Sequence, residues 1–180
     1  MACHNRREQT LDCLGRLFRQ DVLAVGETEI HVFLVDDGST DGTSDAVREE
    51  FAQVQVIQAS GALYWAASMR LAEDCANLES FEWILWLNDD VLLETGALSE
   101  LLEVAHYLRD SIVVGQLRTP GTEAVSYGGV RLIGNPPRRV IRLWAQSRPE
   151  MADTFNGNCV LIPRHVNDRV GGIDGAFAHR

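Results

Sequence analysis

The stretch Trp83-Ile84-Leu85-Trp86-Leu87-Asn88-Asp89-Asp90 decides the fold, because a run of large apolar residues ends in two adjacent carboxylates. The apolar run predicts a strand that is buried on both faces of a parallel sheet. Open α/β sheets bind their ligands at the carboxyl ends of such strands. Adjacent carboxylates repel each other, so they are stable together when solvated, hydrogen-bonded or bound to a cation. Two interpretations explain Asn88-Asp89-Asp90 equally well. One is a divalent metal that holds a phosphorylated ligand, and the other is a polar turn without a ligand.

Strand and helix patterns alternate on both sides of this stretch. Residues 30–35 form an apolar run that ends at Asp36, and residues 54–57 predict another short strand. Apolar residues at helical spacing predict helices around residues 11–18, 43–51, 63–78 and 98–108. The third of these helices is expected to bury Leu63, Ala67, Leu71, Cys75 and Leu78. Repeated strand–helix units predict an α/β fold, with a mostly parallel sheet flanked by helices.

The pattern changes after residue 111 to a mixed, β-rich portion. Residues 112–117 predict a strand, and residues 123–130 and 140–144 predict the arms of a hairpin around Gly134-Asn135-Pro136-Pro137. Residues 153–162 are expected to be extended, and residues 163–170 to form a short helix closed by Gly171-Gly172. We therefore expect one domain over residues 1–180, with a nucleotide-binding-like part (1–110) and a mixed part (111–180).

Composition narrows the class of protein. A chain of 180 residues suits one domain, and its net charge of −10 argues against a nucleic-acid-binding surface. The four cysteines contain no Cys-x-x-Cys pair, which fits a reducing compartment. No apolar stretch approaches the ~20 residues of a membrane span, and no signal peptide is visible. The expected location is the cytoplasm.

A second acidic loop, residues 35–43, follows the strand at 30–35 and precedes a helix. Its side chains, including Asp36, Asp37, Ser39 and Asp41, can accept hydrogen bonds from a base or ribose, or can merely cap the helix. Two acidic loops at the ends of different strands favour a shared site, since both ends open onto one edge of the sheet. A calcium-binding EF-hand loop is excluded, because its twelfth position would be Arg48 instead of Glu.

Four stretches carry a resemblance to a known family. They are Cys3-His4-Asn5-Arg6, Val35-Asp36-Asp37-Gly38-Ser39-Thr40-Asp41, Leu87-Asn88-Asp89-Asp90, and Asn156-Gly157-Asn158 through Gly171-Gly172-Ile173-Asp174. In this order they resemble the family 2 glycosyltransferases, which have the GT-A fold. The resemblance implies an inverting transferase that uses a nucleoside-diphosphate sugar, Mg²⁺ or Mn²⁺, and a glycan or lipid-linked acceptor. It also implies peripheral membrane association through that acceptor, at the inner face of the membrane.

The resemblance assigns roles to individual residues. Asn88-Asp89-Asp90 matches the family's Asp-x-Asp motif, with Asn88 in place of the first Asp and Asp90 as the metal contact. The implied nucleotide-sugar-binding residues are Cys3, Asn5, Asp36, Asp37, Gly38, Ser39, Gly61, Ala62, Asn88 and Asp89, and the implied acceptor-side residues are Gly157, Asn158 and Asp174. Trp65 is the tryptophan expected to face a ligand. Arg70 is expected either at the diphosphate or in a surface ion pair, and Asp174 alternatively in a turn.

The catalytic base is not assigned. In the family it belongs to an acidic pair beyond the segment that matches residues 171–177, and the chain ends at Arg180. Met1-Ala2-Cys3 is also short for a complete first strand, so we expect a fragment, with an incomplete C-terminal part. Three functions stay open: an active transferase, a catalytically silent domain that binds nucleotide and metal, and an α/β interaction module whose acidic loops are structural.

Overall fold

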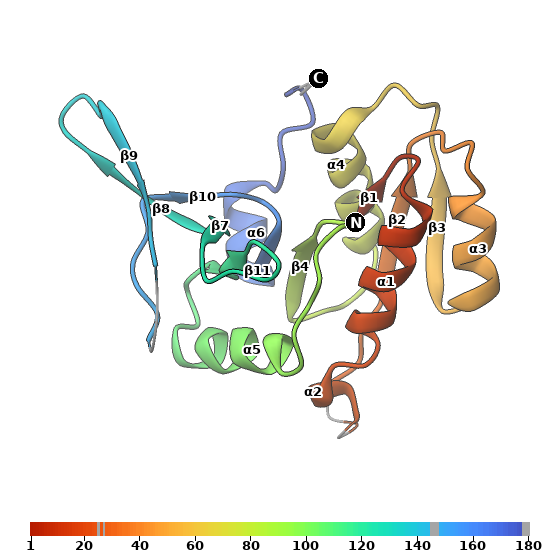
Figure 1. Ribbon diagram of the computed structural model, residues 1–180, viewed down its shortest axis with the longest axis horizontal. Helices are drawn as coiled ribbons and strands as arrows, with labels where there is room; N and C mark the ends of the chain where they lie inside the picture. Colours follow the sequence, from red (N-terminus) through yellow and green to blue (C-terminus); the bar gives the residue numbers. More distant parts are fainter. Residues whose placement is uncertain (25, 27, 145–147, 178–180) are drawn as a thin grey trace.

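The first part of the chain alternates strands and helices, as Figure 1 shows. The computed structural model describes residues 1–24, 26, 28–144 and 148–177. Its first elements are β1 (Ala2–Cys3), α1 (Arg7–Leu17), α2 (Asp21–Ala24), β2 (Val32–Asp36), α3 (Thr43–Glu50), β3 (Val54–Gln58), α4 (Tyr64–Ala76), β4 (Trp83–Leu87) and α5 (Ala97–Tyr107). Each strand and helix predicted within residues 1–110 is present.

β2 is the centre of a three-stranded parallel sheet with the order β1-β2-β3. All five of its residues are buried, because helices cover both faces. Val32 and Leu34 pack in the core cluster that includes α1, while Phe33 and Val35 pack with residues of α4 on the opposite face. This arrangement explains the continuous apolar run, and it directs the carboxyl end of β2 towards the acidic loop at residues 36–41.

The prediction for β4 is only partly correct. The strand covers Trp83–Leu87 as expected, but it pairs antiparallel with β11 (Cys159–Pro163) in a separate sheet with the order β4-β11-β5. Trp83, Leu85 and Trp86 are half-buried, so the strand is not fully buried on both faces. An apolar run predicts that a segment is buried. It does not predict whether the neighbouring strand is parallel or antiparallel, because that strand lies about seventy residues further along the chain.

The predicted buried face of α4 is also shifted. The helix buries Ala66, Ser68, Met69, Ala72 and Glu73. The predicted residues within it are only half-buried, and Leu78, which follows the helix, is 88% exposed. Ser68 and Glu73 are polar, so apolar spacing could not place them on the buried side.

The second part is β-rich, and a hairpin surrounds the predicted turn, but its first arm begins at Gly129, and residues 125–127 of the expected arm at residues 123–130 pair with another strand. Its elements are β5 (Val113–Val114), β6 (Leu117–Arg118), β7 (Val125–Tyr127), β8 (Gly129–Ile133), β9 (Arg139–Arg142), β10 (Thr154–Phe155), β11 and α6 (Arg164–Val170). β8 and β9 pair antiparallel around the predicted turn, and α6 ends at Gly171 with φ of +88°. The expected strand at 112–117 is divided into β5 and β6.

A cavity of about 840 Å³ lies between β2 and β4. One wall contains residues 30–33, the opposite wall contains Trp83–Leu87, and α4 and α5 contribute residues such as Ala72 and Leu102. Met1 lies at its margin, and the lining contains none of the predicted site residues. The described part of the chain contains no helix that is long and apolar enough to cross a membrane.

Candidate functional site

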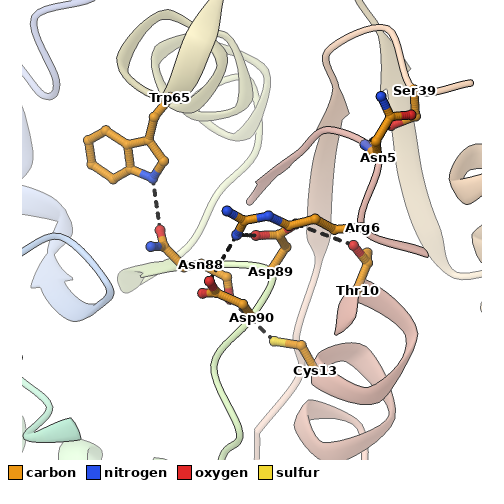
Figure 2. A network of polar contacts seen from close by, with 9 residues as sticks. All are labelled: Asn5, Arg6, Thr10, Cys13, Ser39, Trp65, Asn88, Asp89 and Asp90. Carbon is orange, nitrogen blue, oxygen red and sulfur yellow. Dashed lines mark hydrogen bonds and ion pairs between the residues drawn. The ribbon is translucent and has the colours of Figure 1, made fainter. Parts of the chain in front are cut away.

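The turn that follows β1, residues 4–6, is tied to the acidic loop that follows β2. Asn5 has φ of +51°, a left-handed conformation that asparagine adopts more readily than most residues. Its N–H donates to Ser39 Oγ at 2.9 Å, and its Oδ1 accepts from the N–H of Thr40 at 2.7 Å. The structure therefore brings together Asn5 and Ser39, two of the residues that the sequence implicates in nucleotide binding (Figure 2).

The carboxylates of Asp36 and Asp37 form hydrogen bonds within the protein. Asp36 accepts from the N–H of Ser39 at 2.8 Å and from the hydroxyl of Ser44. Asp37 accepts from the N–H of Gly61 at 2.8 Å and from two N–H groups at the start of α4, both at 2.9 Å. Both side chains are buried, and these bonds compensate for their burial. They shape the loop, and their contact with a base or ribose stays a prediction.

Asp37 also explains the position of the glycine-bearing loop before α4. Gly38 and Gly61 have φ of +75° and +86°, and they lie so close that a Cβ on Gly38 would be 2.7 Å from Gly61 Cα. Two loops that the sequence implicates separately are therefore in contact. Ala62 is exposed next to Gly61.

Two cysteines lie behind the site. The Cys3 carbonyl accepts from the Asp37 N–H at 2.9 Å, and its thiol is buried in the core. Cys13, on α1, donates its S–H to the carbonyl of Asn88 at 3.4 Å. Burial raises the pKa of both thiols to about 12, so they are protonated at neutral pH and are not thiolate ligands.

Asn88 joins the acidic triplet to residues that were assigned to the acceptor side. Its Oδ1 accepts from Trp65 Nε1–H at 2.8 Å, and its backbone N–H donates to the carbonyl of Asn158 at 2.9 Å. Gly157 lies against the Trp65 ring, where a Cβ would be 2.7 Å from a ring carbon. Trp65, Gly157 and Asn158 thus meet at the end of β4.

Asp89 and Asp90 share one cation of the protein itself. Arg6 Nη1 is 3.2 Å from Asp89 Oδ1 and 2.8 Å from Asp90 Oδ2 (Figure 2). The second oxygen of Asp89 accepts from the Thr10 hydroxyl at 3.4 Å. The Asp89 side chain is 6% exposed and that of Asp90 is 43% exposed. Burial raises the pKa of Asp89 to about 6, although Arg6 opposes the shift.

The residues present fit a cation that is shared with a phosphorylated ligand. Mg²⁺ binds typically through one or two carboxylates, with water and substrate phosphates at its other positions. Asp90 offers a solvent-accessible carboxylate, and Asp89 lies beside it. Among the described residues, no group of three or more His, Cys, Asp or Glu side chains could hold a metal ion, so the two carboxylates would bind a cation weakly until a diphosphate adds its oxygens. The donor set therefore suits a metal that arrives with a diphosphate.

Asp174 has contacts typical of a turn. Its Oδ1 accepts from the N–H of Ala176 at 2.9 Å. Arg70 forms a salt bridge with Asp74 at 2.8 Å and donates to the carbonyls of Gly171 and Ile173. Arg70 thus anchors the segment that carries Asp174 to α4, in agreement with the ion-pair alternative.

Sequence reasoning missed Arg6 and Thr10 as parts of the acidic site. Arg6 lies within the stretch Cys3-His4-Asn5-Arg6, directly ahead of α1, and Thr10 is one helical turn further. Arg6 belongs to a stretch that carries the family resemblance, but nothing in the sequence indicates its contact with the triplet. The distance between Arg6 and the triplet along the chain concealed it.

Comparisons with known proteins identify the family and the fold. The model of glycosyl transferase family 2 matches residues 1–169. An N-acetylglucosaminyl-diphospho-decaprenol L-rhamnosyltransferase of Mycobacterium tuberculosis strain CDC 1551 / Oshkosh is 26% identical, over 84% of this chain and 57% of the relative. The protein of the same description from strain ATCC 25618 / H37Rv matches to the same extent.

A solved structure shows the same fold. The mannosyltransferase PcManGT from Pyrobaculum calidifontis, in complex with GDP-Man and Mn²⁺, superposes with a TM-score of 0.65 at 16% identity and covers 97% of this chain. The match covers 46% of that structure, and this chain spans little more than half of the curated relatives. The GT-A-like fold expected from the sequence is confirmed. The chain belongs to glycosyl transferase family 2.

Proposed function

We propose that this chain forms the donor-binding part of an inverting, metal-dependent glycosyltransferase. It takes a nucleoside-diphosphate sugar together with Mg²⁺ or Mn²⁺ and transfers the sugar to a glycan or lipid-linked acceptor. The relatives support this class, since the curated ones are named rhamnosyltransferases of a decaprenol-linked substrate. A lipid-linked acceptor would place the protein at the cytoplasmic face of a membrane through peripheral contact.

One observation carries the proposal. The turn at residues 4–6 connects both acidic loops, because Asn5 bonds Ser39 and Thr40 while Arg6 pairs with Asp89 and Asp90. Segments from the ends of β1, β2 and β4 therefore converge on one polar region. β1 and β2 belong to the parallel sheet, and open α/β sheets bind nucleotides at the carboxyl ends of such strands. β4 ends beside them, although it belongs to the separate sheet.

The chemistry assigns distinct tasks to these residues. A bound metal would neutralise the charge that develops on the departing diphosphate. Asp90 would hold the metal, with Asp89 beside it, while the loop around Gly38, Ser39, Gly61 and Ala62 would receive the nucleoside. Gly157 lies against Trp65 and Asn158 bonds the backbone of Asn88, and these two residues would form the acceptor side. Inversion requires a base that deprotonates the acceptor hydroxyl, and that residue stays unassigned.

Thermal unfolding with Mn²⁺ and UDP, GDP or dTDP tests donor binding. A ligand at one hundred times its Kd stabilises by about 2.7 kcal/mol, which raises Tm by roughly 5–10 °C for a chain of this size. Asp90→Ala should abolish the metal-dependent part of this increase. Asp168→Ala, which removes an equally charged side chain from an exposed salt bridge on α6, should retain it.

The outcomes separate the three functions. Stabilisation by a nucleotide and Mn²⁺ together with turnover of a sugar nucleotide supports the transferase. Stabilisation without turnover indicates a silent binding domain. No shift with any of the three nucleotides would contradict both and favour an interaction module.

A further inference from the structure

The contact between Arg6 and the acidic pair has a consequence for metal binding. A single guanidinium nitrogen contacts both carboxylates, at 3.2 Å and 2.8 Å. Two neighbouring carboxylates, one of them buried, need a positive charge nearby. Arg6 supplies that charge from within the protein. Its own positive charge would repel a second cation that approaches Asp90.

The surroundings of Arg6 allow its side chain to leave the two carboxylates and to bind another partner. Its backbone is fixed, because its carbonyl accepts from the N–H of Thr10 at 2.9 Å in the first turn of α1. Its side chain is 48% exposed, and the side chain of Asp90 is 43% exposed. Asp89 keeps its hydrogen bond to Thr10 if Arg6 moves. The guanidinium can therefore leave the carboxylates without disturbing the helix.

We propose that Arg6 is an exchangeable counter-ion for the metal site. It neutralises Asp89 and Asp90 while no metal is bound, releases Asp90 when a divalent cation binds, and then contacts the diphosphate that the cation brings. Guanidinium groups bind phosphate oxygens through two parallel hydrogen bonds, so the released side chain has a suitable second partner. This inference rests on the proposed function, because it assigns a further residue to the same donor site.

The proposal predicts opposite effects of one substitution on two ligands. Arg6→Gln removes the competing charge, so the affinity for Mn²⁺ alone should increase about three- to fivefold, the range expected for an exposed ion pair. In saturating Mn²⁺ the same variant should bind the preferred nucleoside diphosphate about tenfold more weakly. Arg6→Lys, which keeps the charge but not the planar fork, should bind Mn²⁺ nearly as the unmodified protein does.

Arg7→Gln is the matched control. It removes the same charge one residue away, where the exposed Arg7 side chain lies beside Gly42 and not on the acidic pair. Its affinity for both ligands should change by less than about twofold, since only long-range screened attraction is altered. Mn²⁺ binding is measured from the electron paramagnetic resonance signal of free Mn²⁺, and nucleotide binding by calorimetry, on variants whose circular dichroism matches that of the unmodified protein.

The outcomes distinguish this inference from the proposed function. A lower or unchanged Mn²⁺ affinity in Arg6→Gln would overturn the counter-ion role even if metal and nucleotide bind normally to the unmodified protein. Equal changes in Arg6→Gln and Arg7→Gln would also overturn it, as a general charge effect. If Mn²⁺ binds to none of these proteins, either alone or with a nucleoside diphosphate, both proposals are refuted.

Discussion

At the scale of single residues, Gly38 shows how little room the site leaves. Its φ of +75° disfavours any side chain, and a Cβ would lie 2.7 Å from Gly61 Cα. Gly121 has the same φ of +75°, but a Cβ there would have no other atom within 4 Å. Substituting Gly121 by alanine therefore measures the conformational cost alone. We expect Gly121→Ala to lower the free energy of unfolding by about 1 kcal/mol and Gly38→Ala by roughly 2–4 kcal/mol.

Urea unfolding of both variants checks this prediction. The excess loss in Gly38→Ala measures the contact between the loop after β2 and the loop before α4. Equal losses in the two variants would show that the loops separate without cost. Nucleotide binding should weaken in Gly38→Ala only, because Gly121 lies in the turn between β6 and β7, which makes none of the contacts described for the candidate site.

At the scale of elements, the apolar patterns predicted the strands and helices well but not their partners. β2 is buried on both faces as its run of apolar residues indicates. Asp41 accepts from the N–H of Thr43, but the N-cap position of α3 is Gly42, so the expected capping by Asp41 is wrong. β4 has an equally apolar sequence, yet its partner β11 is antiparallel. The periodicity of one segment contains no information about which distant segment pairs with it.

The same limit applies to the candidate site. The acidic residues could be found because they follow apolar runs directly, and the structure brings their loops into one region. Arg6 could not be assigned in this way, since its contact with Asp89 and Asp90 depends on the placement of β1 and α1 relative to β4. Residues whose role arises from tertiary contact carry no local pattern.

His31 and Glu79 connect two elements, because His31 directly precedes β2 and Glu79 follows α4. His31 Nδ1 contacts Glu79, and Nε2 lies 3.1 Å from Glu29. The hydrogen bond with Glu79, and secondarily that with Glu29, raises the pKa of His31 above its usual 6.5. This pair stabilises the fold fully between pH 4.5 and 6.5. Its contribution is lost as the pH rises through the raised pKa of His31, and also as the pH falls through the lowered pKa of Glu79.

Glu79→Gln should therefore lower the pKa of His31 more than Glu29→Gln does. Titration of the His31 ring signals by NMR measures both shifts. The loss of stability with rising pH should also begin at a lower pH in Glu79→Gln. A larger shift in Glu29→Gln would reverse the assignment of the dominant partner.

At the scale of the whole molecule, the cavity between β2 and β4 has Met1 in its lining, next to β1. It is bounded by the strand edges at residues 30–33 and Trp83–Leu87 and by helices α4 and α5. The Met1 ammonium at its margin donates to the Phe33 carbonyl at 2.8 Å, in line with the β1–β2 ladder, and burial lowers its pKa to about 6. Since Ala2 lies opposite Val35, four residues joined ahead of Met1 would lie opposite Phe33, Val32, His31 and Ile30.

A variant that carries Val-Ile-Val-Val ahead of Met1 should therefore extend β1 into the cavity. Each valine or isoleucine buried there contributes about 1.5–3 kcal/mol against roughly 1.5 kcal/mol for ordering the residue. The four residues together give a net gain of up to about 6 kcal/mol, and a gain of about 3 kcal/mol, the middle of that range, would raise Tm by roughly 6–12 °C. The control is Gly-Ser-Gly-Ser at the same place, which also replaces the ammonium by an amide but adds no apolar surface. The same increase in both variants would attribute the effect to the lost charge alone, whereas an increase confined to the apolar extension requires that the cavity accepts a strand.

Because β1 leads directly into Asn5 and Arg6, such an extension should also tighten Mn²⁺-dependent nucleotide binding, by fixing the turn that joins the two acidic loops.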